Sequence, residues 1–269
     1  MSNGFVMRTL PFTGSGAIAN LGNDYAGIVW QSGVADAVAI VVDLGADVDL
    51  DTIGLFGIAG TLLSSASLRV SLATAAQGPA MNGSNVTTGT GTGNFWQPFT
   101  QALYAGSSMP VLGGGRSLWQ KPAGGPPLFR YVNINVFGMG ATNYVQMSRV
   151  AIGKRIQLDR NFVFGGAFGV RDLGNFDLSP RGVLIRRRSV KLRTAGVSFP
   201  HIHRDEVEAQ VTPLLERLGN TEVVMLVTEP DAHAQRQNRM YLGPMVGDLS
   251  AVWAKADGFE WRCNLVSLF

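Results

Sequence analysis

Short apolar segments separated by turn-rich stretches fill the first 153 residues, and this pattern constrains the fold more than any other feature. The segments are VAIVVDL (38–44), TIGLFGI (52–58), SLRVSLAT (67–74), LFRYVNINVFG (128–138) and NYVQMSRVAIG (143–153). β-Branched and apolar runs of this length are typical of strands. The stretches NGSNVTTGTGTGN, GGGR and AGGPP between them are typical of loops. The pattern therefore predicts a β-sandwich or jelly roll.

Charge and glycine are distributed unevenly along the chain. Residues 1–150 contain six basic and six acidic residues, whereas the shorter segment 151–269 contains sixteen and thirteen. Glycine shows the opposite trend, with 23 of the 34 glycines in the first 150 residues. A change of this size near one position indicates a domain boundary. We therefore predict one domain over 1–155 and a second over 156–269.

The second domain combines strand and helix patterns. RGVLIRRRSVKLRTAGVSF (181–199) is typical of long strands, and HRDEVEAQVTPLLERLGN (203–220) has its apolar residues at helical spacing. Pro213 predicts either a kink or a second helix that begins at Thr212 and Pro213. Asp257-Gly258 is a hairpin turn signal. After it Phe259, Trp261, Cys263 and Leu265 alternate onto one strand face. We expect an α+β domain whose sheet is covered by one helix.

Two clusters have features of metal sites. Asp47, Asp49 and Asp51 match the start of a calcium loop, but Thr52 and Ile58 stand where the loop needs glycine and glutamate. Apolar residues alternate with these aspartates, which favours the corner between two strands. His201 and His203 share a face only in an extended strand, and His233 is the only other histidine. We expect helix capping and surface hydrogen bonds there instead of a metal.

Neither a nucleophile motif nor a phosphate-binding motif is present. The sequence has no G-x-S-x-G, and GGGR (113–116) lacks the P-loop lysine. Cys263 is the only cysteine and lies in an alternating strand, where a buried thiol is expected. The sequence predicts no enzyme, no cofactor and no metal. It also has no apolar run of the ~18 residues that span a membrane, and its first residues do not resemble an export signal.

The densest run of positive charge is a candidate subunit interface. Its members are Arg186, Arg187, Arg188, Lys191 and Arg193. In a strand these residues place arginine on both faces, which a buried strand does not tolerate. The run is either a solvated strand that extends beyond its sheet or a contact with acidic groups of a neighbouring copy. Nucleic-acid binding ranks third, because only one short stripe is basic and the net charge is +3.

Tryptophans of the first domain are candidate glycan contacts. Trp96 and Trp119 lie in or beside expected loops, as does the less favoured Trp30. Exposed aromatic rings on such loops can stack on sugars. The alternative is that these rings fill the ends of the sandwich.

Both domains resemble known families. IVWQSG (28–33), VAIVVDLGADVDLDTIGLFGI (38–58), FRYVNINVFG (129–138) and VQMSRVAIGKR (145–155) resemble the galactose-binding-like (discoidin-type) jelly roll. FPHIHRDEVEAQVTPLLERLGN, VVMLVTEPDAHAQRQNRMYLGPM and the last strand with Trp261 are similar to the tail-tube-like domains of phage tail-tip proteins. Distal tail proteins combine these two domains and form hexameric rings between tail tube and hub. They usually carry the tube-like domain first, whereas here it is second.

The resemblance implies a non-enzymatic virion structural protein of a long-tailed phage. It implies a ring of identical copies, hexameric or trimeric, that joins other tail tube, hub and fibre proteins. Such a protein would be assembled in the host bacterial cytoplasm and reside in the tail tip, where the first domain could touch host glycans. The alternatives are a monomeric carbohydrate-binding module protein and a glycan hydrolase with a sugar module. The hydrolase lacks a recognisable pair of catalytic carboxylates.

Overall fold

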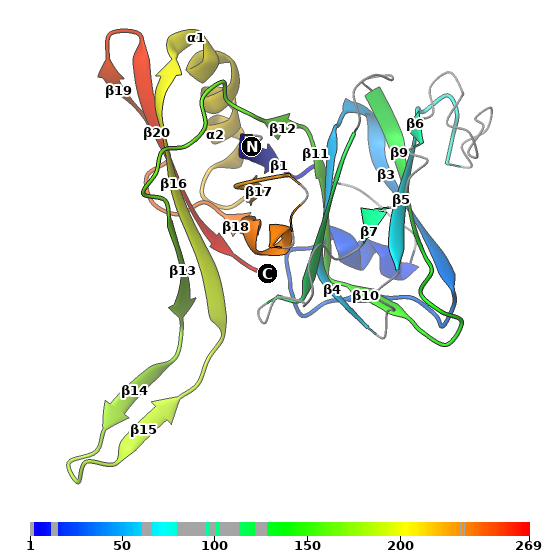
Figure 1. The fold of residues 1–269 in the computed structure, drawn as a ribbon, viewed down its shortest axis with the longest axis horizontal. Helices are drawn as coiled ribbons and strands as arrows, with labels where there is room; N and C mark the ends of the chain where they lie inside the picture. The colour runs from blue at the N-terminus through cyan, green and yellow to red at the C-terminus, as the bar shows by residue number, and fades with distance from the viewer. Residues whose placement is uncertain are drawn as a thin grey trace. The chain divides into compact units, whose positions relative to one another are not determined.

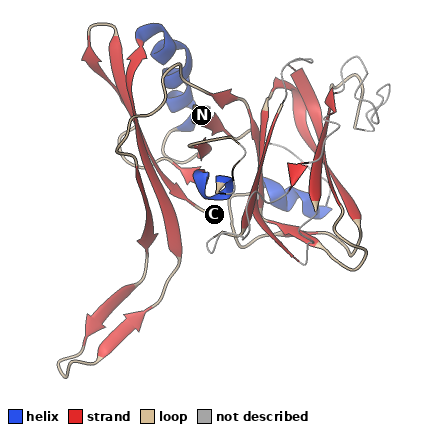
Figure 2. Ribbon diagram, in the orientation of Figure 1, coloured by secondary structure: helices blue, strands red, loops and turns tan. Residues whose placement is uncertain are grey.

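The computed structural model describes residues 3–11, 16–60, 66–79, 95–96, 101–102, 113–121, 128–231, 233 and 235–269. The chain divides into two compact units, and each has its own hydrophobic core. The jelly-roll unit comprises Met7–Arg155 and Pro230–Met240, and the α+β unit comprises Met1–Val6, Ile156–Glu229 and Tyr241–Phe269. Strands dominate both units, as Figures 1 and 2 show. The loop expected at 82–94 lies outside the described residues.

Two antiparallel sheets form the jelly-roll unit. The first has the order β11-β4-β10-β2, with β8 paired to β4, and the second has the order β3-β9-β5-β6, with β7 paired to β5. The strands of the first sheet are β2 (Trp30–Gln31), β4 (Thr52–Gly60), β8 (Gly115–Gln120), β10 (Val145–Met147) and β11 (Arg149–Gly153). Those of the second are β3 (Ala37–Asp49), β5 (Ser67–Ala73), β6 (Phe95–Trp96), β7 (Gln101–Ala102) and β9 (Leu128–Phe137). The prediction of a mainly β fold with a jelly-roll sandwich is confirmed.

Each predicted strand of this unit exists, but the last is split in two. The strand expected at 143–153 is interrupted at Ser148, whose backbone N–H donates to the Phe56 carbonyl oxygen at 3.1 Å. Opposite it, β4 carries a bulge at Gly57, whose φ is +68°. A side chain at Gly57 would meet the Ser148 hydroxyl, so glycine is needed at this close approach.

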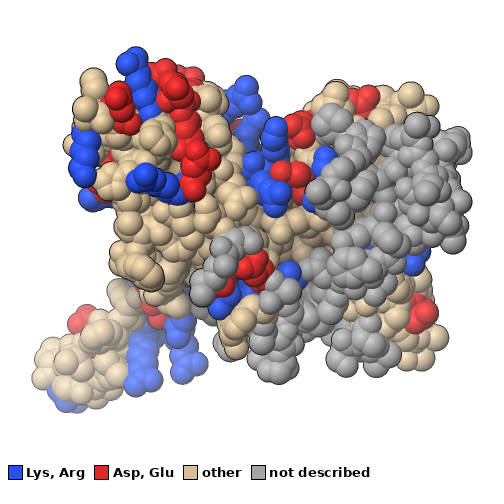
Figure 3. Space-filling model, turned by 45° about the horizontal axis from the view of Figure 1, so that its top comes forward, with Lys and Arg blue, Asp and Glu red and all other residues tan. Residues whose placement is uncertain are grey.

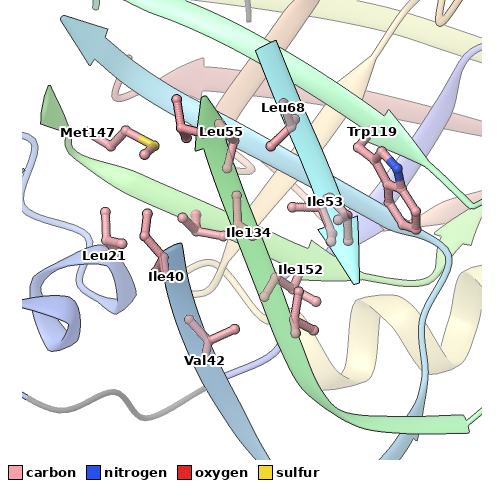
Figure 4. Close-up of a cluster of buried hydrophobic side chains, with 14 of the residues drawn as sticks. Leu21, Ile40, Val42, Ile53, Leu55, Leu68, Trp119, Ile134, Met147 and Ile152 are labelled. Atoms are coloured by element: carbon pink, nitrogen blue, oxygen red, sulfur yellow. The ribbon is translucent and has the colours of Figure 1, made fainter. Parts of the chain in front are cut away.

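The jelly-roll core lies between the two sheets (Figure 4). Ile40 and Val42 of β3 face Ile134 and Val132 of β9 across the ladder, and all four are fully buried. The alternating residues of these strands are partly exposed, which is the period-two pattern of a strand with one buried face. A 3-10 helix, η1 (Gly16–Gly22), contributes Leu21 to the same core.

The main sheet of the α+β unit is antiparallel and has the order β13-β16-β20-β19. Its strands are β13 (Ala167–Asp172), β16 (Lys191–His203), β19 (Ala251–Lys255) and β20 (Gly258–Ser267). The expected hairpin is confirmed, since Asp257 has φ +57° between β19 and β20. A second sheet of order β12-β1-β17-β18 contains β12 (Arg155–Ile156), β1 (Phe5–Arg8), β17 (Val223–Val227) and β18 (Met240–Pro244).

One continuous helical segment covers the main sheet, as predicted. It consists of α1 (Arg204–Glu206), a π-helical turn η2 (Val207–Val211) and α2 (Thr212–Leu218). The π turn ends at Val211, two residues before Pro213. Pro213, which has no backbone N–H to donate, therefore lies in the first turn of α2. The inward residues Val207, Val211, Leu214 and Leu218 share a core with Phe199 and Trp261. No helix among the described residues is long and apolar enough to cross a membrane.

Candidate functional site: an exposed β-hairpin arm

A long hairpin extends from the main sheet of the α+β unit. β13 pairs with the first half of β16, from Ala167 opposite Gly196 to Asp172 opposite Lys191. The hairpin continues as a two-stranded ribbon of β14 (Asn175–Leu178) and β15 (Leu184–Arg187). Figure 1 shows this ribbon projecting away from the sheet, at the end opposite α1. We call residues 167–190 the arm.

Local hydrogen bonds specify the arm as a hairpin. The Leu173 N–H donates to the Val190 carbonyl oxygen at 3.1 Å, which keeps the two strands together between β13 and β14. At the tip the Ser179 N–H donates to the Val183 carbonyl oxygen at 2.9 Å, and the Val183 N–H donates to the Ser179 hydroxyl oxygen at 3.1 Å. Gly182 supplies the positive φ, +76°, that this tight turn requires. The arm is therefore a defined element and not an irregular loop.

Apolar side chains on the arm are unusually exposed. From Val163 to Lys191 no residue is buried. Nine large apolar side chains of the arm are at least two-fifths exposed: Phe168, Val170, Leu173, Phe176, Leu178, Val183, Leu184, Ile185 and Val190. So many exposed apolar side chains on one element are typical of an interaction site.

The distal ribbon has two different faces. Cross-strand partners point to the same side of a ribbon, so the pairs of β14 and β15 divide into two sets. One face presents Phe176, Leu178, Leu184 and Arg186, and the other presents Asn175, Asp177, Ile185 and Arg187. We call the first set the apolar face of the arm. Phe176, the most exposed member with 74% of its surface accessible, stands directly opposite Arg186.

The energetics favour a partner for this ribbon. An isolated two-stranded hairpin is at best marginally stable in water. Covering one half-exposed Leu, Ile or Phe gains on the order of 1 kcal/mol, whereas association costs roughly 4–15 kcal/mol in lost freedom of motion. One side chain therefore cannot hold a partner, but most of the arm acting together can.

The root of the arm is fixed within its own unit. The Phe168 ring stacks on Tyr241, with centroids 6.0 Å apart, and the Arg193 guanidinium lies 4.3 Å from the centroid of the same Tyr241 ring. Burial lowers the pKa of Arg193, and interactions with Tyr241 act in the opposite direction. Of the predicted interface residues, Arg193 thus contacts its own unit, while Arg186, Arg187, Arg188 and Lys191 are exposed.

The arm and the covering helix carry opposite charge. The arm contains five basic residues and two acidic ones, a net charge of +3. Residues 204–222, which we call the helix end, contain five acidic residues and two basic ones, a net charge of −3. Figure 3 shows basic residues on the arm and acidic residues gathered over the helix end. The Arg204–Glu208 ion pair, 2.8 Å long, involves one of these carboxylates.

A shallow apolar groove lies beside the helix. Its volume is about 330 Å³, and it is formed by the helix together with the β19–β20 hairpin. Val207, Leu215, Ala251 and Phe259 contribute apolar surface, and Glu216 stands at the groove. Glu216 is exposed and forms no ion pair within the described part of the chain. The groove thus combines an apolar lining with a carboxylate.

The structure corrects the interpretation of Trp119 as a glycan contact. Trp119 is only 1% exposed and belongs to the jelly-roll core, so its ring is not accessible to a sugar (Figure 4). Trp30, at 6% exposed, belongs to the same core. Both rings fill the sandwich, which was the alternative interpretation. The side chain of Trp96 lies outside the described residues.

The aspartates of β3, and Asp51 just after it, have structural partners. The Asp43 carboxylate accepts two hydrogen bonds from the Arg130 guanidinium, at 2.8 and 2.9 Å, and this contact lowers the pKa of Asp43. The Asp49 carboxylate lies 2.6 Å from the Lys154 ammonium. The other two carboxylates accept backbone hydrogen bonds, Asp47 from Ala75 and Asp51 from Arg155. Among the described residues no group of three or more His, Cys, Asp or Glu residues could hold a metal ion.

Neither the family comparison nor the comparison with curated proteins finds a match for this chain. Solved structures do show similarity to it. Chitosan-binding module 1 of a chitosanase/glucanase from Paenibacillus sp. IK-5 is 15% identical, with a TM-score of 0.34, and the match covers 56% of this chain and 95% of the module. The lectin domain of lectinolysin, in complex with Lewis B antigen, is 13% identical with a TM-score of 0.33, covering 55% and 94%.

The f-lectin from striped bass (Morone saxatilis) serum is also similar. It is 11% identical with a TM-score of 0.32, and the match covers 98% of this chain and 90% of the lectin. The sequences of the neighbours do not assign a ligand to this chain.

The basic residues of the arm were predicted from the sequence, but its apolar face was not. The segment 181–199, predicted as strand, forms β15 and β16 with a break at 188–190 that was not predicted. The available signal was the alternation in NFDL (175–178), which places Phe176 and Leu178 on one side, and Leu184 lies on that side because it pairs with Leu178. Pairing of these two segments depends on the turn at 179–182, which the sequence analysis did not identify.

Proposed function

We propose that this protein is a non-enzymatic structural subunit that assembles with identical copies through its arm. The observation that carries the proposal is the set of nine exposed apolar side chains on a hydrogen-bonded hairpin. A hairpin that exposes so much apolar surface to water is unfavourable in a monomer, because such surface promotes association. The same surface suits a subunit whose neighbours cover the arm.

The assembly that fits the sequence resemblance is the tail tip of a long-tailed phage. In this proposal the protein forms a ring, hexameric or trimeric, that joins the tail tube to the hub, with fibre proteins as further partners. Head-to-tail contacts between identical copies close into rings or continue as filaments. The protein would then be assembled in the cytoplasm of the host bacterium and reside in the virion.

Native mass of the full-length chain tests the proposal. Light scattering over a range of concentrations is expected to reveal a discrete oligomer for the natural sequence. Leu184→Asp, on the apolar face of the arm, is expected to yield monomers. Ile185→Asp is the matched control, because it introduces the same charge one residue later on the opposite face. Retention of the full oligomer by Leu184→Asp would contradict the proposal.

The alternative function is carbohydrate binding by the jelly-roll unit. Chitosan-binding module 1 and the lectin domain of lectinolysin in complex with Lewis B antigen are among the structures similar to this chain. Trp96 is the remaining candidate for stacking on a sugar, since Trp119 is buried. Tight binding to a glycan array by a monomeric protein, lost in Trp96→Ala, would favour this alternative over assembly.

A further inference from the structure

The partner surface of the arm follows from where opposite charges lie on one copy. The arm leads into β16 at Lys191, and α1 begins directly after the other end of β16 at His203. A strand of 13 residues is about 40 Å long, at ~3.3 Å per residue. The basic arm and the acidic helix end are therefore at opposite ends of the same strand, as Figure 1 shows. They cannot meet within one copy.

We infer that the arm of one copy docks on the helix end of the next copy, with the apolar face of the arm in the groove beside the helix. This inference rests on the proposed function and specifies its contact. Phe176, Leu178 and Leu184 supply apolar side chains, and the groove offers Val207, Leu215 and Phe259. Burying both apolar surfaces together removes them from water.

Charge complementarity selects a second copy as the occupant. Arg186 stands on the apolar face of the arm, and Glu216 stands at the groove. An arginine brought next to an unpaired carboxylate can donate two parallel hydrogen bonds. The net charges of the two surfaces, +3 and −3, are equal and opposite. A contact between different surfaces of identical copies is head-to-tail, which suits a closed ring.

A charge exchange between the two surfaces tests the inference. Arg186→Glu places a carboxylate against the acidic helix end, and Glu216→Arg places a guanidinium against the basic arm. Each single variant is expected to associate about tenfold or more weakly than the natural sequence, because like charges then oppose each other. Sedimentation velocity of the full-length chain measures the dissociation constant. Arg187→Glu, on the opposite face of the arm, is the matched control and is expected to have a smaller effect.

A mixture of the two single variants provides the decisive test. Where the two variants alternate, residue 186 of each copy faces residue 216 of opposite charge on the next, so contacts between unlike copies, and with them an even-numbered ring, are expected to be regained. The double variant Arg186→Glu/Glu216→Arg is expected to regain the oligomer alone. Failure of both restorations overturns the inference, as does a natural sequence that remains monomeric at every concentration.

The inference and the proposed function can fail separately. If Leu184→Asp abolishes the oligomer while Glu216→Arg has no effect, the arm mediates assembly but docks on another surface. If Leu184→Asp leaves the oligomer unchanged, the arm does not mediate assembly, and the proposed function fails as well. Restoration by the exchanged charges supports both.

Discussion

Among individual residues, Trp119 separates a structural role from a binding role most clearly. Its indole is 1% exposed and packs in the jelly-roll core. Trp119→Ala is expected to lower the free energy of unfolding by about 3–5 kcal/mol, as large-to-small changes of buried aromatic residues do. Urea unfolding monitored by circular dichroism measures this change. Tyr25→Ala, at a ring that is 72% exposed, is the control and is expected to change stability little. An unaffected midpoint for Trp119→Ala would show that the ring is not part of the core.

Cys263 makes stability depend on pH in the alkaline range. Burial raises the pKa of its thiol from 9.0 to about 12. Below pH 9 the thiol is protonated in both states, so its contribution is constant. Above pH 9 the unfolded chain ionises first, and the free energy of unfolding falls as pH rises toward the folded-state pKa. The expected loss between pH 8 and pH 10 is about 1.4 kcal/mol.

The reference for this prediction is Cys263→Ala, which lacks the titrating group. Subtracting its urea-unfolding profile from that of the natural sequence removes the contributions of other groups that titrate in the same range. Equal slopes for both proteins between pH 8 and pH 10 would contradict the burial of the thiol. A difference in stability that does not change with pH would report only the cavity left by the substitution.

At the scale of elements, the arm should be dispensable for folding. No residue of the arm is buried, and its contacts with the rest of the unit are concentrated at the root near Tyr241. Replacing residues 174–189 by Asn-Gly joins Leu173 to Val190, which are already hydrogen-bonded, through a favoured two-residue turn. The free energy of unfolding of the dilute protein is expected to change by less than about 1 kcal/mol. A large fall in the free energy of unfolding, or loss of the cooperative unfolding transition, would show that the arm belongs to the folded core of its unit.

Most strands could be predicted from the sequence because their signal is local. Alternation in β3, β9 and β20 places Ile40, Ile134 and Cys263 inward, and neighbours in the sequence determine that pattern. Pro213 predicted either a kink or a second helix that begins at Thr212 and Pro213, and α2 begins at Thr212 within one continuous helical segment. The break of the 181–199 segment into β15 and β16 was missed, because strand pattern does not reveal where a strand leaves its sheet.

The candidate site was harder to predict than the strands. The basic run identified the arm, but the exposure of Phe176 and Leu184 depends on the absence of covering elements along the described arm. The composition of a strand cannot show whether another element packs on it. For the same reason Trp119 looked like a loop residue in sequence, whereas it lies in a strand with its ring in the core.

At the scale of the molecule, each unit is built from segments that are not contiguous in the sequence. Met1–Val6 belongs to the α+β unit, which otherwise contains residues from the second half of the sequence. Pro230–Met240 belongs to the jelly-roll unit, which otherwise contains residues 7–155. The second of these segments contacts buried Arg116 of the jelly-roll unit. The Arg116 backbone N–H donates to the side-chain oxygen of Gln237 at 2.9 Å. Such long-range pairing could not be predicted from a local sequence pattern.

The proposed assembly also accounts for the opposite charges at the two ends of β16. β16 carries the basic arm at its first residue and the acidic helix end after its last. A subunit with complementary surfaces at opposite ends can join copies in series. The same geometry leaves an open arm on any isolated copy, so association should rise with protein concentration.

Amide hydrogen exchange of the arm tests the central claim most directly. The full-length protein would be labelled at a low concentration, where it is monomeric, and at a high concentration, where it is assembled. Peptides that cover residues 167–191 are expected to exchange rapidly in the dilute sample and to be protected in the concentrated one. Peptides of the jelly-roll core around Ile134 serve as an internal control and should exchange equally in both. If the concentrated protein forms oligomers while the arm exchanges as rapidly as in the monomer, the arm is not the contact and the account is contradicted.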